Sequence, residues 1–185
     1  MSLEEKRREK QMNTRVLVML SLLVGMGAVL HAVLPPFFLG MRPDMMLAMM
    51  FLGIILFPKL PYVVVLSAAT GMISALTTTV PGGQLANLID KPITAFIFFA
   101  LFLSLRNVLK HAAAPVLTAV GTLISGTIFL SCVLFVIGMM EASFGAMFVT
   151  IVLPTAIINT VAMVIIYPVA QTILKRTTPA QSMSV

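Results

Sequence analysis

The stretch VLVMLSLLVGMGAVLHAVL (residues 16–34) contains no Lys, Arg, Asp or Glu. It matches the roughly 20 apolar residues that a helix needs to cross the hydrocarbon core of a bilayer. Five further runs with few charges follow at regular intervals, at residues 45–57, 62–76, 93–105, 112–138 and 144–173. This spacing predicts six transmembrane helices.

The composition agrees with that prediction, because 59% of the chain is apolar and 10% is charged. Such values are typical of membrane proteins. The second and fourth runs are short, so we expect their helices to begin earlier, near Met41 and Leu88. Six helices leave no room for a soluble domain in 185 residues. The predicted fold is an all-α integral membrane protein, with one membrane domain over residues 1–185.

Basic residues predict the orientation of the bundle, because Lys and Arg of short loops stay on the cytoplasmic side. With the amino end inside, ten bases fall on inner segments and two on outer ones. We therefore expect both termini to be cytoplasmic, as a basic tail (residues 1–14), six helices (15–174) and a short tail (175–185). The run EEKRREK (residues 4–10) then fits orientation and attraction to anionic membrane lipid, not nucleic-acid binding.

Motifs for catalysis are missing from the sequence. It has no HExxH, no GxSxG, no GxxxxGK[ST] phosphate loop and no paired acids spaced for metal or acid-base work. The single cysteine, Cys132, allows neither a disulfide nor a thiolate metal site within one chain. We expect no enzyme activity, no cofactor and no metal.

Polar residues gather on the predicted outer side. Three of the six acids, Asp44, Asp90 and Glu141, fall there. They are joined by Arg42, Gln84, Asn87 and Lys91. Asp44 and Asp90 each stand beside a proline at a predicted helix start, where an acid caps free amides. The same acids are also binding candidates, since charges at membrane depth need a partner or a cavity. An acid for an ammonium beside a base for a carboxylate is the charge pattern that suits a zwitterion.

The stretch TTTVPGGQLANLIDKPIT (residues 77–94) predicts a loop of about ten residues. Pro81, Gly82 and Gly83 free backbone amides from a helix, and irregular backbone near membrane depth survives where it lines a cavity or is buried in protein. We interpret this loop as a binding loop. Deeper in the chain, Asn159 predicts either a hydrogen bond between helices or a pocket wall. His31 is a weaker candidate.

Two blocks carry a resemblance to a known family. GMRPDMMLAMMFLGIILFP (residues 40–58) and SALTTTVPGGQLANLIDKPITAF (residues 74–96) resemble the bacterial tryptophan transport protein family. That family is grouped with the substrate-binding S components of energy-coupling factor (ECF) transporters, which are six-helix membrane proteins. The resemblance implies capture of L-tryptophan on the outer side of the bacterial cytoplasmic membrane. It also implies that an ECF transmembrane coupling subunit and a cytosolic ATPase pair supply the energy.

The same resemblance implies a pocket closed by PPFFLGMRP (residues 35–43) and VPGGQLANLID (residues 80–90). It also implies a docking stripe of small residues on the first helix, which here would be Ser21, Gly25, Ala28 and Ala32. Small residues at this spacing let helices approach closely. Packing within the chain explains the stripe equally well.

The resulting hypothesis places the tryptophan carboxylate on Arg42 or Lys91 and on amides near Gly82 and Gly83. Its ammonium would contact Asp44 or Asp90, and its indole N–H would contact Asn87 or Asn159. Two alternatives stay open: an autonomous carrier driven by an ion gradient, and a membrane scaffold that binds an extracellular protein.

Overall fold

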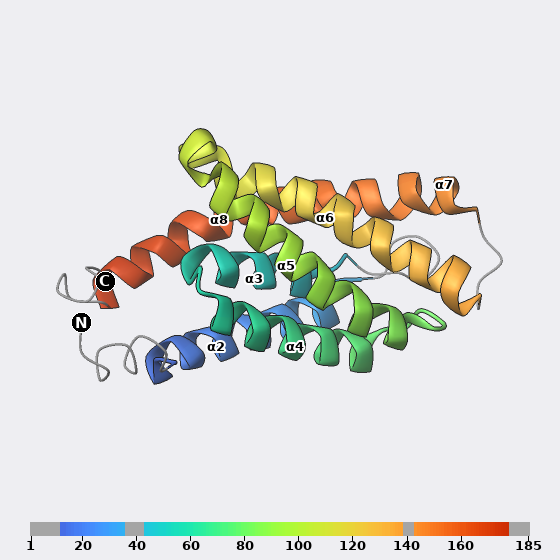
Figure 1. Ribbon diagram of the computed structural model, residues 1–185, viewed down its shortest axis with the longest axis horizontal. Helices are drawn as coiled ribbons and strands as arrows, with labels where there is room; N and C mark the ends of the chain where they lie inside the picture. The colour runs from blue at the N-terminus through green and yellow to red at the C-terminus, as the bar shows by residue number, and fades with distance from the viewer. Residues whose placement is uncertain (1–11, 36–42, 139–142, 178–185) are drawn as a thin grey trace.

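A computed structural model describes residues 12–35, 43–138 and 143–177, and these form a bundle of helices (Figure 1). In chain order they are α2 (Thr14–Val33), α3 (Met45–Leu56), α4 (Leu60–Thr77), α5 (Gly83–Leu109), the short 3-10 turn η1 (Lys110–Ala112), α6 (Ala113–Ser131) with its π-helical continuation η2 (Cys132–Ile137), and then α7 (Phe144–Met147), η3 (Phe148–Val152) and α8 (Leu153–Thr177). The last three run on as one rod. The described chain thus builds six helical rods, as the sequence predicts.

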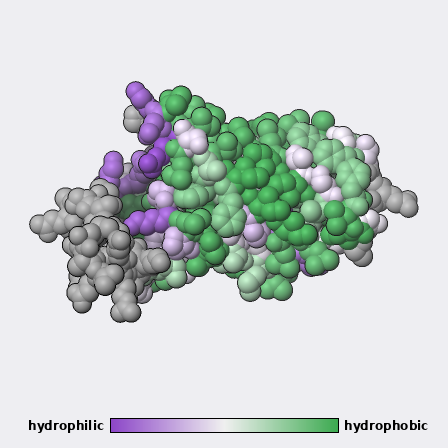
Figure 2. All heavy atoms as spheres, viewed as in Figure 1, coloured by the Kyte–Doolittle hydropathy of each residue, from purple (hydrophilic) through white to green (hydrophobic). Residues whose placement is uncertain are grey.

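Five of these rods are long and apolar enough to cross a membrane. They are Thr14–Val33, Leu60–Thr77, Gly83–Leu109, Ala113–Ile137 and Phe144–Arg176. Large apolar side chains such as Leu22, Val29 and Leu76 are exposed along them, where lipid tails would cover them. Figure 2 shows this apolar surface as a broad belt along the helices. The chain is a multi-pass membrane protein.

The sixth rod, α3, is different because it is short and lies inside the bundle. It has 12 residues, and every residue from Met45 to Ile55 is buried. It contacts α2, α4, α5, α6 and α8. A helix that is apolar on all sides is found in a protein core or in a membrane span, and α3 is covered by the neighbouring helices of the bundle. At about 1.5 Å per residue, α3 is shorter than the helices around it, and its first turn lies within the bundle.

The two ends of the bundle differ in charge. The first residue of α2 and the last residue of α8 lie at the same end (left in Figure 1). Basic residues stand at the helix termini of this end, which we call the basic end: Arg15, Lys59, Arg106, Lys110, Lys175 and Arg176. Figure 2 shows hydrophilic atoms gathered there. The bases thus gather at one end of the bundle, as the sequence predicts. That this end is cytoplasmic stays a prediction.

The start of α5 corrects the sequence prediction. The helix begins at Gly83, not near Leu88, so Pro92 lies inside it and Asp90 is not at its start. A proline within a membrane helix loses only one backbone hydrogen bond, which neighbouring helices can compensate. Only residues 78–82 therefore separate α4 from α5, and the prediction of a ten-residue loop is wrong. Gly82 makes this short turn possible, because its φ of 74° lies in the left-handed region that glycine tolerates.

The start of α3 confirms one prediction and corrects another. The helix begins at Met45, four residues later than the expected start near Met41. Asp44 is its N-cap, and the carboxylate accepts a hydrogen bond from the Leu47 amide at 3.0 Å. The capping role predicted for Asp44 is confirmed. The corresponding role predicted for Asp90 is wrong, because Asp90 lies within α5.

Candidate functional site

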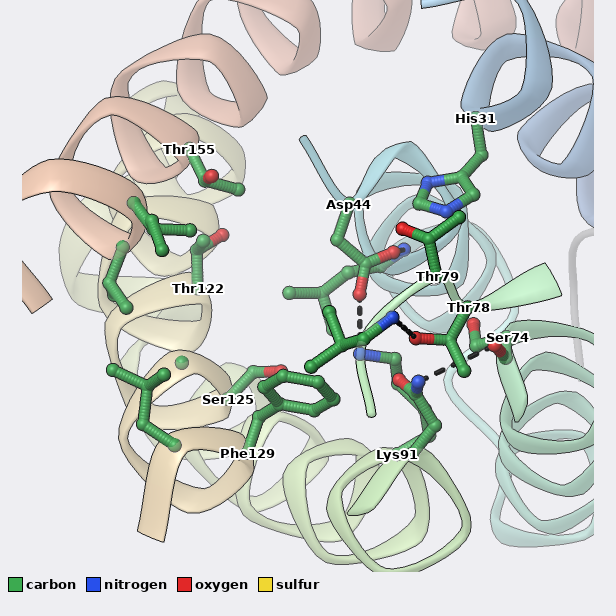
Figure 3. A pocket seen from close by; sticks show the side chains of 17 residues that line it. His31, Asp44, Ser74, Thr78, Thr79, Lys91, Thr122, Ser125, Phe129 and Thr155 are labelled. Carbon is green, nitrogen blue, oxygen red and sulfur yellow. Dashed lines mark hydrogen bonds and ion pairs between the residues drawn. The ribbon is translucent and has the colours of Figure 1, made fainter. Parts of the chain in front are cut away.

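A cavity of about 100 Å³ opens between the helices in the half of the bundle opposite the basic end, which we call the pocket end. Its wall draws on α2, α3, α4, α5, α6, η3 and α8. Figure 3 shows charged groups near its centre, hydroxyl groups on both sides and a phenylalanine ring beside them. Among the described residues, the lining consists of His31, Asp44, Leu47, Ser74, Thr78, Thr79, Val80, Asn87, Lys91, Thr122, Ser125, Gly126, Phe129, Leu130, Ile151, Val152 and Thr155.

Lys91 is the centre of the charged group. Its ammonium donates to Asp90 Oδ2 at 2.8 Å and also forms an ion pair with Asp44 Oδ2. Its side chain is buried. α4 packs against α5 here, and a Cβ added to Gly71 would lie 3.5 Å from Lys91 Cβ, an ordinary contact distance. A buried lysine needs such partners, because removing an unpaired charge from water is costly.

Asp90 is fully enclosed by protein partners. Its Oδ1 accepts from Thr94 Oγ1 at 2.7 Å, and its Oδ2 accepts from Ser125 Oγ at 2.7 Å as well as from Lys91. The side chain is 0% exposed and does not line the cavity. This set of contacts ties α5 to α6 and holds Lys91 in position. Asp90 therefore positions Lys91, and its own oxygens, outside the cavity lining, bind Thr94, Ser125 and Lys91.

Asp44 has a more open environment. It contacts Lys91 and the Leu47 amide, it lines the cavity, and its side chain is 23% exposed. Its position explains this exposure, because Asp44 caps the first turn of the short α3, and this turn lies inside the bundle. Of the two carboxylates on Lys91, Asp44 is the one that a ligand can reach.

A second polar region covers one side of the cavity. His31 Nδ1 lies 3.1 Å from the Pro43 carbonyl, which can only accept, so this nitrogen carries a proton. Asn87 donates to Gly83 O at 2.9 Å and Ser74 O at 3.4 Å, and so links α5 to α4. Thr78 Oγ1 accepts from the Val80 amide at 3.2 Å within the short turn.

The opposite side of the cavity is mainly apolar. Phe129, Leu130, Ile151 and Val152 line it, with Thr155 beside them. Two π-helical segments lie next to these residues: η2 begins two residues after Leu130, and η3 ends at Val152. Such segments are rare and are often found at functional sites. The cavity thus joins a charged region to an apolar, aromatic one.

This arrangement suits a ligand that has both an ammonium group and an apolar body. Two carboxylates and one ammonium leave one negative charge in excess when all three are ionised. A ligand cation is attracted to that excess. Within residues 12–35, 43–138 and 143–177, no group of three or more His, Cys, Asp or Glu side chains is placed to hold a metal ion.

The predicted substrate-binding residues lie in different places. Asp44, Asn87 and Lys91 come together in the cavity wall. Gly82, Gly83, Gln84, Asp90 and Asn159 do not line it. The Gly83 amide donates to Val80 O at 2.9 Å, Gln84 is exposed, and Asn159 donates to Thr122 Oγ1 at 3.3 Å between α8 and α6. Arg42 and Glu141 lie outside the described residues. The binding roles stay predictions.

The small-residue stripe of α2 lies largely on the outside of the bundle. Ser21, Gly25 and Ala32 are exposed, and Ala28 is partly buried against the core. A Cβ added to Gly25 would meet nothing within 4 Å. Packing within the described chain therefore does not account for Gly25.

Sequence reasoning missed the hydroxyl residues of the cavity. Ser74, Thr122 and Ser125 line it together with Thr155, but serine and threonine are common in membrane helices, and the sequence does not mark these three as cavity residues. Thr118, Thr122 and Ser125 repeat at helical spacing, and this sequence signal would have indicated a polar face on α6. In the structure all three are buried.

The fold and the cavity together define a class: a multi-pass membrane protein with a polar cavity inside its helix bundle. Comparison with known proteins gives the family. The family described as "Tryptophan transporter TrpP" matches residues 13–175, and the chain belongs to this family. No solved structure shows a significant match.

Three curated relatives share the name "Probable tryptophan transport protein". The Bacillus subtilis protein is 53% identical over 165 residues, which cover 89% of this chain and 95% of the relative. The Clostridium acetobutylicum protein is 37% identical, and the match covers 85% of this chain and 92% of the relative. The Clostridium perfringens protein is 34% identical, and the match covers 89% of this chain and 95% of the relative. The resemblance seen in the two sequence blocks is confirmed.

Proposed function

We propose that this chain is the substrate-capture subunit of a tryptophan importer in the bacterial cytoplasmic membrane. In this proposal L-tryptophan enters the cavity from outside, and both termini are cytoplasmic. One observation carries the proposal: a member of the tryptophan transporter family has a reachable carboxylate beside a buried lysine in a cavity with an aromatic wall.

The ammonium group of tryptophan would bind Asp44. This carboxylate is the more exposed of the two on Lys91, and the local excess of negative charge favours a cation. A charge-assisted hydrogen bond in a site that excludes water is about twice as strong as a neutral one. Asp90 would keep Lys91 in position without contacting the substrate.

The indole ring would lie on the apolar side of the cavity. Phe129 offers an aromatic face, and Leu130, Ile151 and Val152 offer apolar surface. Aromatic rings gain from offset or edge contacts beyond the area that they bury. The absence of tryptophan from the whole chain also suits a protein that is made when tryptophan is scarce.

Energy for transport would come from an ECF module, since the chain has no phosphate loop of its own. The coupling subunit would dock on the small-residue stripe of α2, where Ser21, Gly25 and Ala32 are exposed and Ala28 is partly buried. Open space around Gly25 supports this, because a small residue facing outward allows a partner helix to approach closely.

Two measurements test the proposal. The first is equilibrium binding of labelled L-tryptophan to the purified chain in detergent, with phenylalanine, tyrosine and histidine as competitors and no ATPase present. Saturable binding that prefers tryptophan is expected. Absence of binding, together with ion-dependent uptake in sealed vesicles, would favour an autonomous carrier, and absence of both would favour a scaffold.

The second measurement is tryptophan uptake by cells that express the chain with or without an ECF module. Uptake that depends on the module is expected. Equal uptake in cells without any such module would contradict the S-component mechanism and leave the tryptophan-binding part intact.

A further inference from the structure

Ser74 is unusual among the helical hydroxyl groups of this protein. In a membrane helix a serine or threonine ordinarily donates to the carbonyl four residues earlier. Nine described helical hydroxyls follow this pattern, with distances of 2.6 to 2.9 Å: Ser21, Thr77, Ser104, Thr118, Thr122, Thr127, Thr150, Thr160 and Thr172. Thr94 and Ser125 instead donate to Asp90. The Ser74 hydroxyl has no hydrogen-bond partner in the described part of the chain, although the residue is only 6% exposed.

The position of Ser74 gives this unpaired hydroxyl a use. Ser74 lines the cavity from α4 (Figure 3), and Asn87 lines it from α5. Its carbonyl accepts from Asn87 Nδ2 at 3.4 Å, and Asn87 stands one helical turn before Lys91. Gly71, three residues before Ser74, lies directly against Lys91. The hydroxyl therefore lies on the wall of the cavity that α4 and α5 build, and Lys91 lines the same cavity from α5.

The Lys91 ammonium group has more hydrogen-bond donors than the two carboxylates that it contacts. An ammonium group carries three N–H donors, and the hydrogen bonds of Lys91 go to Asp44 and Asp90. Lys91 also lines the cavity. A ligand carboxylate that reached it would still need further donors for its remaining lone pairs. The Ser74 hydroxyl is a donor on the same wall.

We infer that Ser74 and Lys91 together bind the carboxylate of the substrate, while Asp44 binds its ammonium group. The inference rests on the proposed function and adds a residue that determines specificity for free amino acids over amines. A buried hydroxyl without a partner is costly. That cost is removed when a ligand carboxylate accepts a hydrogen bond from the Ser74 hydroxyl. Without ligand, the unpaired hydroxyl is therefore preorganised to bind a carboxylate.

The test compares two ligands on two variants. L-tryptophan has the carboxylate, and tryptamine has the same indole and ammonium group without it. Ser74→Ala removes the proposed donor. Thr70→Val is the matched control, because Thr70 is one turn away on α4, is 0% exposed and also has an unpaired hydroxyl, but does not line the cavity.

We expect Ser74→Ala to weaken tryptophan binding about 10- to 100-fold, the range for losing a hydrogen bond to a charged group. Binding of tryptamine should stay within about twofold of the wild type, and Thr70→Val should leave both ligands unaffected. The ligand-free Ser74→Ala protein should melt no lower than the wild type, because an unpaired polar group has been removed. Ser74→Cys, with its weak donor, should fall between serine and alanine and provides the test if the alanine variant does not fold.

Unchanged tryptophan affinity in Ser74→Ala would overturn the inference. Equal weakening of tryptophan and tryptamine would also overturn it, since the hydroxyl would then act on another part of the ligand or on the fold. A wild-type chain that binds no tryptophan would overturn the proposed function itself, and this result is visible before any variant is made.

Discussion

Asp44 and Asp90 both bind Lys91, but they lie in different environments. Asp90 is 0% exposed and accepts from Thr94, Ser125 and Lys91. Asp44 is 23% exposed, caps a helix and borders the cavity. The protein itself supplies all the hydrogen-bond partners that enclose Asp90, whereas Asp44 has room for a further partner. The comparison teaches that a charge at membrane depth becomes a binding group where the fold leaves it incompletely enclosed.

Lys91→Met is expected to have the largest effect, because it removes the partner of both carboxylates. Breaking a buried ion pair in this way costs about 3–5 kcal/mol of stability. Thermal unfolding in detergent should show a much lower melting temperature, and tryptophan binding should be lost. A variant that melts like the wild type would mean that Lys91 is not required to compensate Asp90.

Asp44→Asn is expected to reduce affinity strongly with a smaller effect on the fold. Removing a buried charge that pairs with a ligand costs about 2–5 kcal/mol of binding free energy. An asparagine can still cap α3 through its side-chain oxygen, so the melting temperature should change less than in Lys91→Met. Calorimetric titration with tryptophan measures the affinity, and wild-type affinity in this variant would contradict the assignment of the ammonium group to Asp44.

Asp90→Asn is expected to reverse the pattern of Asp44→Asn. The amide leaves Ser125 or Lys91 with a poorer partner, which costs about 1–3 kcal/mol of stability. Tryptophan affinity should fall less than in Asp44→Asn, because Asp90 does not line the cavity. The same titration and melting experiments distinguish the two variants. If Asp90→Asn weakens binding more than Asp44→Asn does, the roles of the two carboxylates are exchanged.

Gly25→Leu is expected to have the smallest effect on the purified protein. A Cβ added at Gly25 meets nothing within 4 Å, so stability should change by less than about 0.5 kcal/mol and tryptophan affinity should stay the same. Uptake in cells that contain an ECF module should nevertheless fall if a partner helix docks here. Leu22→Ala, on the same exposed side of α2, provides a control that keeps the stripe intact.

Much of this architecture could be predicted from sequence, because local composition determines it. Long apolar runs with few charges identified the helical rods, and the acids and bases among them indicated the pocket end. Asp44, Asn87 and Lys91 were predicted together because they stand out chemically against an apolar background.

The remaining features depend on contacts between distant parts of the chain. Lys91 meets Asp44 across 47 residues, and Ser125 meets Asp90 across 35. No local pattern shows that Asp90 is enclosed and Asp44 open. The start of α5 was misplaced because a proline was interpreted as a helix start, although Pro92 lies inside the helix. Ser74 was missed because only the structure shows that its hydroxyl is unpaired.

The most direct test of the account uses the fluorescence of the substrate itself. The chain contains no tryptophan, so emission from an added indole reports on the ligand alone. We would titrate L-tryptophan with the purified wild type, Asp44→Asn and Asp90→Asn. The account predicts a saturable blue shift with the wild type and Asp90→Asn, and its loss with Asp44→Asn. An equal shift with all three proteins would contradict the claim that Asp44 is the ammonium-binding group of a tryptophan site.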